Sequence, residues 1–137
     1  MNYLDPSFSP ADIRQISILG LAHVGDAVYE LMVRTFLLSS SHTASLDLHR
    51  STIALVNAKA QAKAFEKISS LLTEEESAVF KRGRNAKVNQ VPHNASAAEY
   101  HTATGLEALF AWLWLKGEDD RRRELFAAAY PEKPEET

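Results

Sequence analysis

The stretch from Leu106 to Leu115, LEALFAWLWL, is apolar apart from Glu107. Apolar residues on every face of a helix are typical of a helix that is buried all round. The stretch is too short to cross a bilayer, which takes about 20 residues, so it predicts the central helix of a globular core. Glu107 is the anomaly, and the alternative is that it lies at the rim of a helix face. No neighbour three or four residues away carries a charge, and an unpaired buried carboxylate costs several kcal/mol.

Helix start and stop signals divide the rest of the chain. Ser9 followed by Pro10 reads as a helix start, and Thr73 with Glu76 and Ser96 with Glu99 have the form of capping boxes. With the apolar spacing, these signals predict helices from Pro10, over 20–38, 45–70, 74–82, 97–116 and 118–130, and a loop over 83–95. No segment alternates with period two. We therefore expect an all-α fold in a single domain over 1–137.

Composition excludes several classes of protein and of site. The 137 residues include no cysteine, which excludes disulfides, thiolate metal sites and a cysteine nucleophile. The N-terminus lacks the basic and apolar pattern of a secretory signal, and no apolar stretch is long enough to span a membrane. We expect a cytoplasmic protein in which any metal ion is bound by oxygen or imidazole ligands.

The charge is unevenly distributed along the chain. The net charge is −3, but residues 31–98 carry nine basic side chains against five acidic ones. Within them, residues 81–87 read KRGRNAK, which places four cations at the end of a predicted helix and the start of the predicted loop. Some of this charge could complement the helix dipole. Four cations in seven residues exceed that need, so the segment is a candidate phosphate-binding element.

A second anomaly lies in the predicted helix over 20–38. Asp26 and Glu30 are four residues apart, so they stack on one face, and His23 shares that face. Stacked like charges destabilise a helix slightly, and a divalent cation would remove the conflict. Oxygen ligands favour Mg²⁺ or Mn²⁺ over zinc. The alternative is a solvated polar stripe.

Two segments carry a resemblance to a known family. Residues 23–28, HVGDAV, and 105–110, GLEALF, are similar to the two acidic helices of the ribonuclease III catalytic domain. Asp26 and Glu107 match the family's Asp in a Gly-Asp-Ala context and its Glu in a Glu-Ala-Leu context. The KRGRNAK segment and the short chain resemble the Mini-ribonuclease III branch, which consists of the catalytic domain alone. The likeness extends over about residues 16–130.

The resemblance implies a helical homodimer that binds double-stranded RNA between its subunits. It implies hydrolysis that leaves 5′-phosphate and 3′-hydroxyl ends, with Asp26 and Glu107 catalytic and binding Mg²⁺, for which Mn²⁺ is expected to substitute. The substrate implied is the 23S ribosomal RNA precursor, with ribosomal protein L3 as a partner. The residues expected to contact RNA are Lys81, Arg82, Arg84, Asn85 and Lys87.

The chain departs from the larger family at two acidic positions, which are held here by Ala22 and Thr104. The site would then bind fewer ions, bind them through water, or recruit Glu30 as a further ligand. No double-stranded-RNA-binding domain is present. A non-catalytic RNA-binding or ribosome-associated module with the same fold is therefore the alternative function. A carboxylate metalloprotein built on a helical bundle is disfavoured, because it would need paired Glu-x-x-His motifs.

Overall fold

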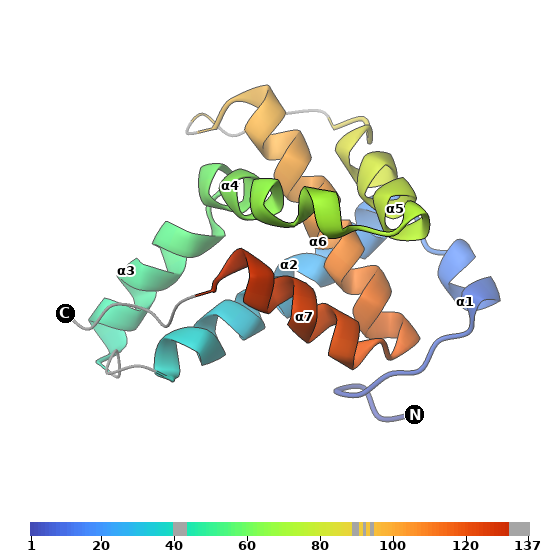
Figure 1. The fold of residues 1–137 in the computed structure, drawn as a ribbon, viewed down its shortest axis with the longest axis horizontal. Coiled ribbons are helices and arrows are strands. Elements are labelled where there is room, and N and C mark those ends of the chain that lie inside the picture. The colour runs from blue at the N-terminus through green and yellow to red at the C-terminus, as the bar shows by residue number, and fades with distance from the viewer. Residues whose placement is uncertain (40–43, 89–90, 92, 94, 132–137) are drawn as a thin grey trace.

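The chain folds entirely into helices and connecting segments in the computed structural model, which describes residues 1–39, 44–88, 91, 93 and 95–131 (Figure 1). The helices are α1 (Pro10–Arg14), α2 (Ile18–Leu38), α3 (Ser45–Val56), α4 (Ala58–Ile68), the 3₁₀-helix η1 (Ser69–Leu71), α5 (Glu74–Arg84), α6 (Ala97–Lys116) and α7 (Asp119–Ala129). No strand occurs in the described residues. The expected all-α class is confirmed.

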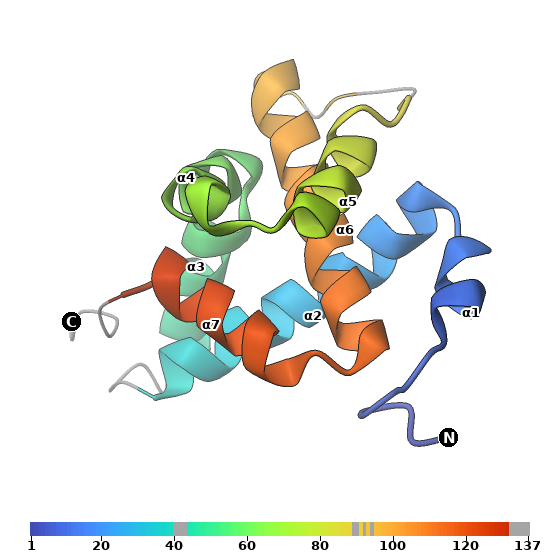
Figure 2. The same ribbon diagram turned by 45° about the vertical axis from the view of Figure 1, so that its right-hand side comes forward.

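Helix α6 runs through the middle of the molecule, and the other helices pack around it (Figures 1 and 2). Its most extensive contacts are with α2, α5 and α4. Residues on all sides of α6 are buried, including Ala103, Leu106, Phe110 and Leu113, each at most 5% exposed. The prediction of a helix buried all round is therefore confirmed.

The larger apolar cluster joins α2, α4, α6 and α7. Its fully buried members include Tyr29, Ile68, Phe110 and Leu125, and burying a side chain of this size contributes about 1.5–3 kcal/mol. The rings of Tyr29 and Phe110 meet edge to face with centroids 5.2 Å apart. The Tyr29 hydroxyl lies 2.6 Å from that of Tyr130 in a hydrogen bond. These contacts fix α2 against α6 and α7.

The predicted helix starts are confirmed. Ser9, Thr73 and Ser96 each cap a helix through the side-chain oxygen, and each belongs to a capping box. Helix α6 ends at Gly117, whose φ of 77° lies in the left-handed region that glycine adopts without strain. The sequence signals therefore place both ends of the central helix correctly.

The prediction of one helix over 45–70 is wrong, because the chain turns at Asn57. This residue has an extended backbone and ends α3 as it starts α4. Its side-chain oxygen accepts from the amide of Ala60 at 2.8 Å, and its Nδ2 donates to the carbonyl of Ile53 at 3.0 Å. Asparagine can therefore serve both helix ends at once. The turn lets α4 lie across α6.

An ion pair ties α7 to the start of α5. The Arg121 guanidinium donates to both carboxylate oxygens of Glu76 at 2.8 Å and to the carbonyl of Leu71 at 2.7 Å. Glu76 is 4% exposed, and its hydrogen bonds from Arg121 lower its pKa below the usual range. The pairs of Arg122 with Asp119 and of Arg123 with Asp120 stay within α7.

Candidate active site

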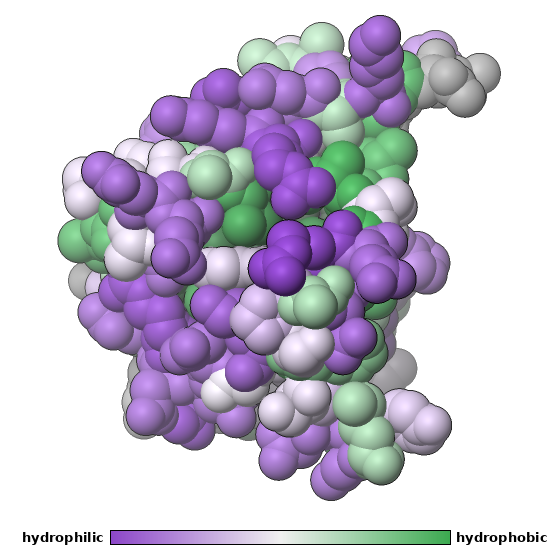
Figure 3. Space-filling model, turned by 90° about the vertical axis from the view of Figure 1, so that its right-hand side faces the viewer, coloured by the Kyte–Doolittle hydropathy of each residue, from purple (hydrophilic) through white to green (hydrophobic). Residues whose placement is uncertain are grey.

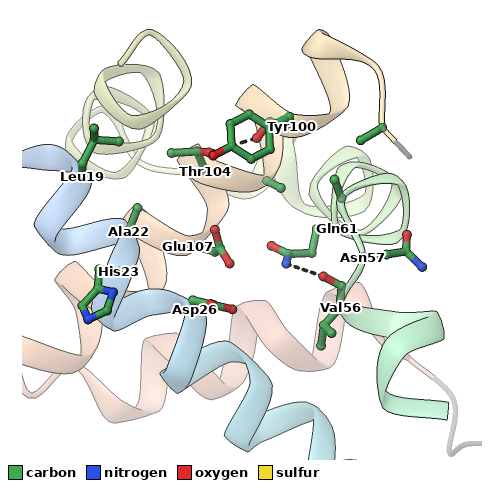
Figure 4. Close-up of a pocket in the computed structure, with 13 residues that line it drawn as sticks. Leu19, Ala22, His23, Asp26, Val56, Asn57, Gln61, Tyr100, Thr104 and Glu107 are labelled. Carbon is green, nitrogen blue, oxygen red and sulfur yellow. Dashed lines mark hydrogen bonds between the residues drawn. The ribbon is translucent and has the colours of Figure 1, made fainter. Parts of the chain in front are cut away.

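Asp26 and Glu107 come together where α2 crosses α6. The crossing is close because Gly25 has no side chain, and a Cβ there would overlap the backbone carbonyl of Glu107. The next residue on α2 is Asp26, and its carboxyl group interacts directly with that of Glu107. Both side chains point into one pocket (Figure 4). Two acids 81 positions apart in the chain are thus juxtaposed by a backbone contact.

Burial changes the protonation of Glu107. Removal from water is the largest cause, and the neighbouring Asp26 carboxylate adds to it, so that the pKa of Glu107 rises to about 8. The amide of Gln61 acts in the opposite direction. No Lys or Arg lines the pocket among the described residues. At neutral pH the Glu107 carboxyl group is therefore mostly protonated.

The pocket is a hollow of about 440 Å³ between α2, α4 and α6. Its labelled lining in Figure 4 comprises Leu19, Ala22, His23, Asp26, Val56, Asn57, Gln61, Tyr100, Thr104 and Glu107. Ala22 and Thr104 are 7% and 6% exposed. The Thr104 hydroxyl donates to the carbonyl of Tyr100 at 3.0 Å. Neither residue adds a charge to the pair of carboxylates.

Gln61 is a site residue that the sequence analysis missed. It lies on α4, is 3% exposed and points toward Glu107 (Figure 4). Its Nε2 donates to the carbonyl of Val56 at 2.8 Å, while its Oε1 is buried without a partner among the described residues. The available signal was its register, because residue 61 shares a helix face with the buried Ala64 and Ile68.

Glu30 and His23 lie at the margin of this pocket. Glu30 is ion-paired with Arg34 at 2.7 Å and lines a neighbouring hollow on α2 rather than the pocket of Glu107. His23 is exposed and lines both hollows, as does Asp26. The structure therefore brings Asp26 to Glu107 and leaves Glu30 one helical turn away.

The basic segment predicted to contact RNA ends α5. Lys81, Arg82 and Arg84 lie in its last turn, Asn85 is the C-cap and Lys87 follows, and all five are exposed. Within the described part of the chain, no ion pair neutralises them. Figure 3 shows hydrophilic side chains gathered over the side of the molecule that carries α1 and α5. The charged side chains of the segment are therefore exposed to solvent.

Helix α5 is held close to α6 by a second crossing of glycines. A Cβ on Gly83 would lie 2.8 Å from the Cα of Gly105, and a Cβ on Gly105 would lie 2.7 Å from the ring of Phe80. Both distances are shorter than normal carbon contacts. The basic segment at the end of α5 is therefore placed relative to α6, the helix that carries Glu107.

The donor atoms of the pocket fit a hard divalent cation. They are carboxylate and amide oxygens, which Mg²⁺ prefers. A cation would also supply the positive charge that the buried Glu107 lacks. No cluster of three or more His, Cys, Asp or Glu side chains suited to a metal occurs within the described residues. Asp26 and Glu107 are the two acidic residues that could hold the ion.

Comparison with known proteins finds one family and several close relatives. Residues 19–118 match the Ribonuclease III domain family. Mini-ribonuclease 3 of Clostridium tetani is 42% identical over 90% of this chain and 82% of that protein. Mini-ribonuclease 3 of Enterococcus faecalis is 42% identical over 83% of this chain and 88% of that protein.

A solved structure shares the fold. A crystal structure of a protein from Fusobacterium nucleatum superposes with a TM-score of 0.77 and 32% sequence identity, covering 88% of this chain and 96% of that one. No described helix of the present chain is long and apolar enough to span a membrane. The fold thus occurs in a protein that is aligned with this chain over nearly its whole length.

Proposed function

The chain belongs to the ribonuclease III family, in its Mini-ribonuclease III branch. We propose that it is an endoribonuclease that hydrolyses phosphodiester bonds in double-stranded RNA. The observation that carries the proposal is the half-buried carboxyl group of Glu107 beside Asp26. A protein has no structural use for two adjacent acids without a counter-charge, since they cost stability. A divalent cation held between them would explain the pair.

The proposed chemistry divides between the ion and the protein. A bound Mg²⁺, for which Mn²⁺ should substitute, would activate water and stabilise the charge that develops on the phosphate. Asp26 and Glu107 are the residues that would hold the ion. Glu107 would do so as the carboxylate, after releasing its proton to solvent. The products would be a 5′-phosphate and a 3′-hydroxyl.

RNA affinity is proposed to come from the basic segment, residues 81–87. Its exposed cations would contact phosphate oxygens, which gives affinity with little sequence selectivity. The Arg84 guanidinium packs 5.8 Å from the centroid of the Phe80 ring, and its Nε donates to Asn85 Oδ1 at 3.2 Å. These contacts hold one cation of the segment in place at the helix end.

We propose that two copies of the chain form the active enzyme. Apolar side chains are exposed along α2 and the N-terminal segment, with Leu31 at 63%, Leu4 at 84% and Tyr3 at 83%. They border one hollow together with Trp114. A second copy on this surface would bury them and bring two pockets to one face, which suits cleavage of both strands of a duplex.

The natural substrate proposed is the 23S ribosomal RNA precursor in the cytoplasm, with ribosomal protein L3 as an assisting partner. A catalytic domain of this size makes few phosphate contacts, so a protein that presents the RNA would strengthen binding. The family resemblance, rather than any surface described above, supports these two assignments.

The test is cleavage of a long double-stranded RNA at low salt, with and without Mg²⁺. Wild-type protein is compared with Asp26→Asn and Glu107→Gln variants whose fold is confirmed by circular dichroism. The proposal expects Mg²⁺-dependent cleavage that both substitutions abolish while RNA binding persists. Intact RNA in the presence of Mn²⁺ and L3 would instead favour a non-catalytic RNA-binding module, the function to which Ala22 and Thr104 would point.

A further inference from the structure

The carbonyl oxygen of Gln61 is a buried acceptor without a partner. Gln61 is 3% exposed, and its Oε1 accepts no hydrogen bond from the described residues. Buried polar atoms in native proteins nearly always have a partner, and an unpaired one indicates a water, an ion or a functional role. The atom lies in the wall of the pocket that contains Asp26 and Glu107.

The orientation of the Gln61 amide follows from its other end. Nε2 donates to the carbonyl of Val56 at 2.8 Å, and turning the amide over would set two acceptor oxygens against each other. As a donor, the Nε2 end of the amide also lowers the pKa of Glu107, so the oxygen is the end of the amide that is left without a partner in the wall of the pocket. Figure 4 shows it turned toward the Glu107 carboxyl group, on the α4 side of the pocket.

Three oxygen-bearing side chains from three helices thus converge in one place. Asp26 comes from α2, Glu107 from α6 and Gln61 from α4. The described lining of the pocket contains no Lys or Arg that could satisfy them. A divalent cation accepts carboxylate and amide oxygens together, and usually keeps waters in its remaining positions.

We propose that Gln61 contributes its Oε1 to the ligand shell of the catalytic cation, either directly or through one ordered water. The inference rests on the proposed function, since it concerns the same ion. It would also compensate for the small number of acidic residues in this pocket, which are Asp26 and Glu107. Ala22 offers no ligand atom, and Gln61 on α4 would supply a further oxygen.

A purely structural role for Gln61 makes a different prediction. In that role the important atom is Nε2, because it ties α4 to the last turn of α3 through Val56. Substitution with glutamate removes this donor but keeps an oxygen in the pocket. Substitution with methionine, which has a similar length and shape, removes both. The pair Gln61→Glu and Gln61→Met therefore separates the two roles.

The experiment measures Mn²⁺ binding to the intact protein in the absence of RNA. Free Mn²⁺ is followed by electron paramagnetic resonance during titration of wild type, Gln61→Met, Gln61→Glu and Asp26→Asn. Gln15→Met is the matched control, because Gln15 is an exposed glutamine at the end of α1, outside the pocket. Circular dichroism and thermal melting confirm the fold of each variant.

We expect Gln61→Met to weaken Mn²⁺ binding about tenfold or more, as loss of a supporting ligand does. Gln61→Glu should bind within about threefold of wild type or more tightly, and Gln15→Met should match wild type. Equal weakening by both Gln61 variants would overturn the inference in favour of the structural role. Unchanged binding by Gln61→Met would also overturn it.

The control variant Asp26→Asn distinguishes failure of the role proposed for Gln61 from failure of the proposed function. If it loses Mn²⁺ binding while Gln61→Met keeps it, the inference fails and the proposed function stands. If wild type and Asp26→Asn both fail to bind Mn²⁺, the proposed metal site itself fails, and the inference fails with it.

Discussion

The backbone carbonyl of Glu107 occupies the space that a side chain on Gly25 would need. This contact sets the distance between α2 and α6, and the carboxylate of Asp26, the next residue on α2, meets that of Glu107 because of it. The two acidic residues are thus positioned by main-chain packing between two long helices.

Gly25→Ala should therefore be severely destabilising. The added methyl group would collide with a carbonyl in the core, where neither backbone can move alone, so we expect a loss of more than about 2 kcal/mol in the free energy of unfolding. Chemical denaturation measures the loss. Gly20→Ala on the same helix is the control, because its Cβ would meet the side chains of Ser17 and Ile16 at 3.0 and 3.2 Å. An equal loss in both variants would contradict the account.

Glu107→Gln should stabilise the metal-free protein at pH 8. The carboxyl ionises near 4.5 in the unfolded chain and near 8 in the folded one. Between these values the folded state binds more protons, so the free energy of unfolding falls as pH rises. Since one pKa unit corresponds to about 1.4 kcal/mol, we expect the variant to gain at least about 1 kcal/mol at pH 8 and little at pH 5.

Thermal or urea unfolding with a chelator present tests this gain at the two pH values. Added Mg²⁺ should then stabilise wild type and leave the variant unchanged, because a ligand stabilises the state that binds it. The same pH dependence in both proteins would show that Glu107 is not the group responsible.

Arg121→Met should cost about 2 kcal/mol, because it leaves the buried Glu76 carboxylate without its cation. The cost should shrink in acid. The pKa of Glu76 is lowered in the folded state, so the pair stabilises the protein above the unfolded pKa near 4.5 and loses its effect as pH falls through the folded value. Arg123→Met is the matched control, since Arg123 and Asp120 are 67% and 98% exposed. It should change stability by less than about 0.5 kcal/mol.

Replacing Lys81 and Arg82 by glutamine should weaken RNA binding with little effect on folding. Both side chains are exposed and unpaired among the described residues. Loss of two phosphate contacts lowers the salt dependence, so the slope of log K against log salt should fall by about 1–2. Filter binding at several salt concentrations measures it, with Arg123→Gln as the control on α7. An unchanged slope would show that RNA lies elsewhere.

Local signals in the sequence were sufficient for most helix ends. The capping boxes at Thr73 and Ser96 and the stop at Gly117 depend on residues close in the chain, so they could be predicted. The break at Asn57 could not. The alanine-rich spacing continues through it, and asparagine inside a helix costs well under 1 kcal/mol, so local propensity does not distinguish a cap from an interior position.

The site was predicted in its acidic part only. Asp26 and Glu107 stood out because each is a charge in an apolar helix, and their motifs indicated a partner for each. Gln61 carries no charge, and its neighbours on α4 are alanines and lysines. Its importance arises when α4 is laid across α6 after the turn at Asn57. That arrangement depends on tertiary packing, which no local pattern encodes.

Residues 105–107 of α6 pack closely against two other helices. Gly105 contacts α5 at Gly83, and Glu107 contacts α2 at Gly25. Close backbone packing therefore fixes the distance between the cations at the end of α5 and the carboxylates. Substitutions that change the volume of other core side chains would leave this distance unchanged. A duplex whose phosphates are spaced to match this distance would be cut at the same position relative to the basic segment, whichever other core residues are replaced.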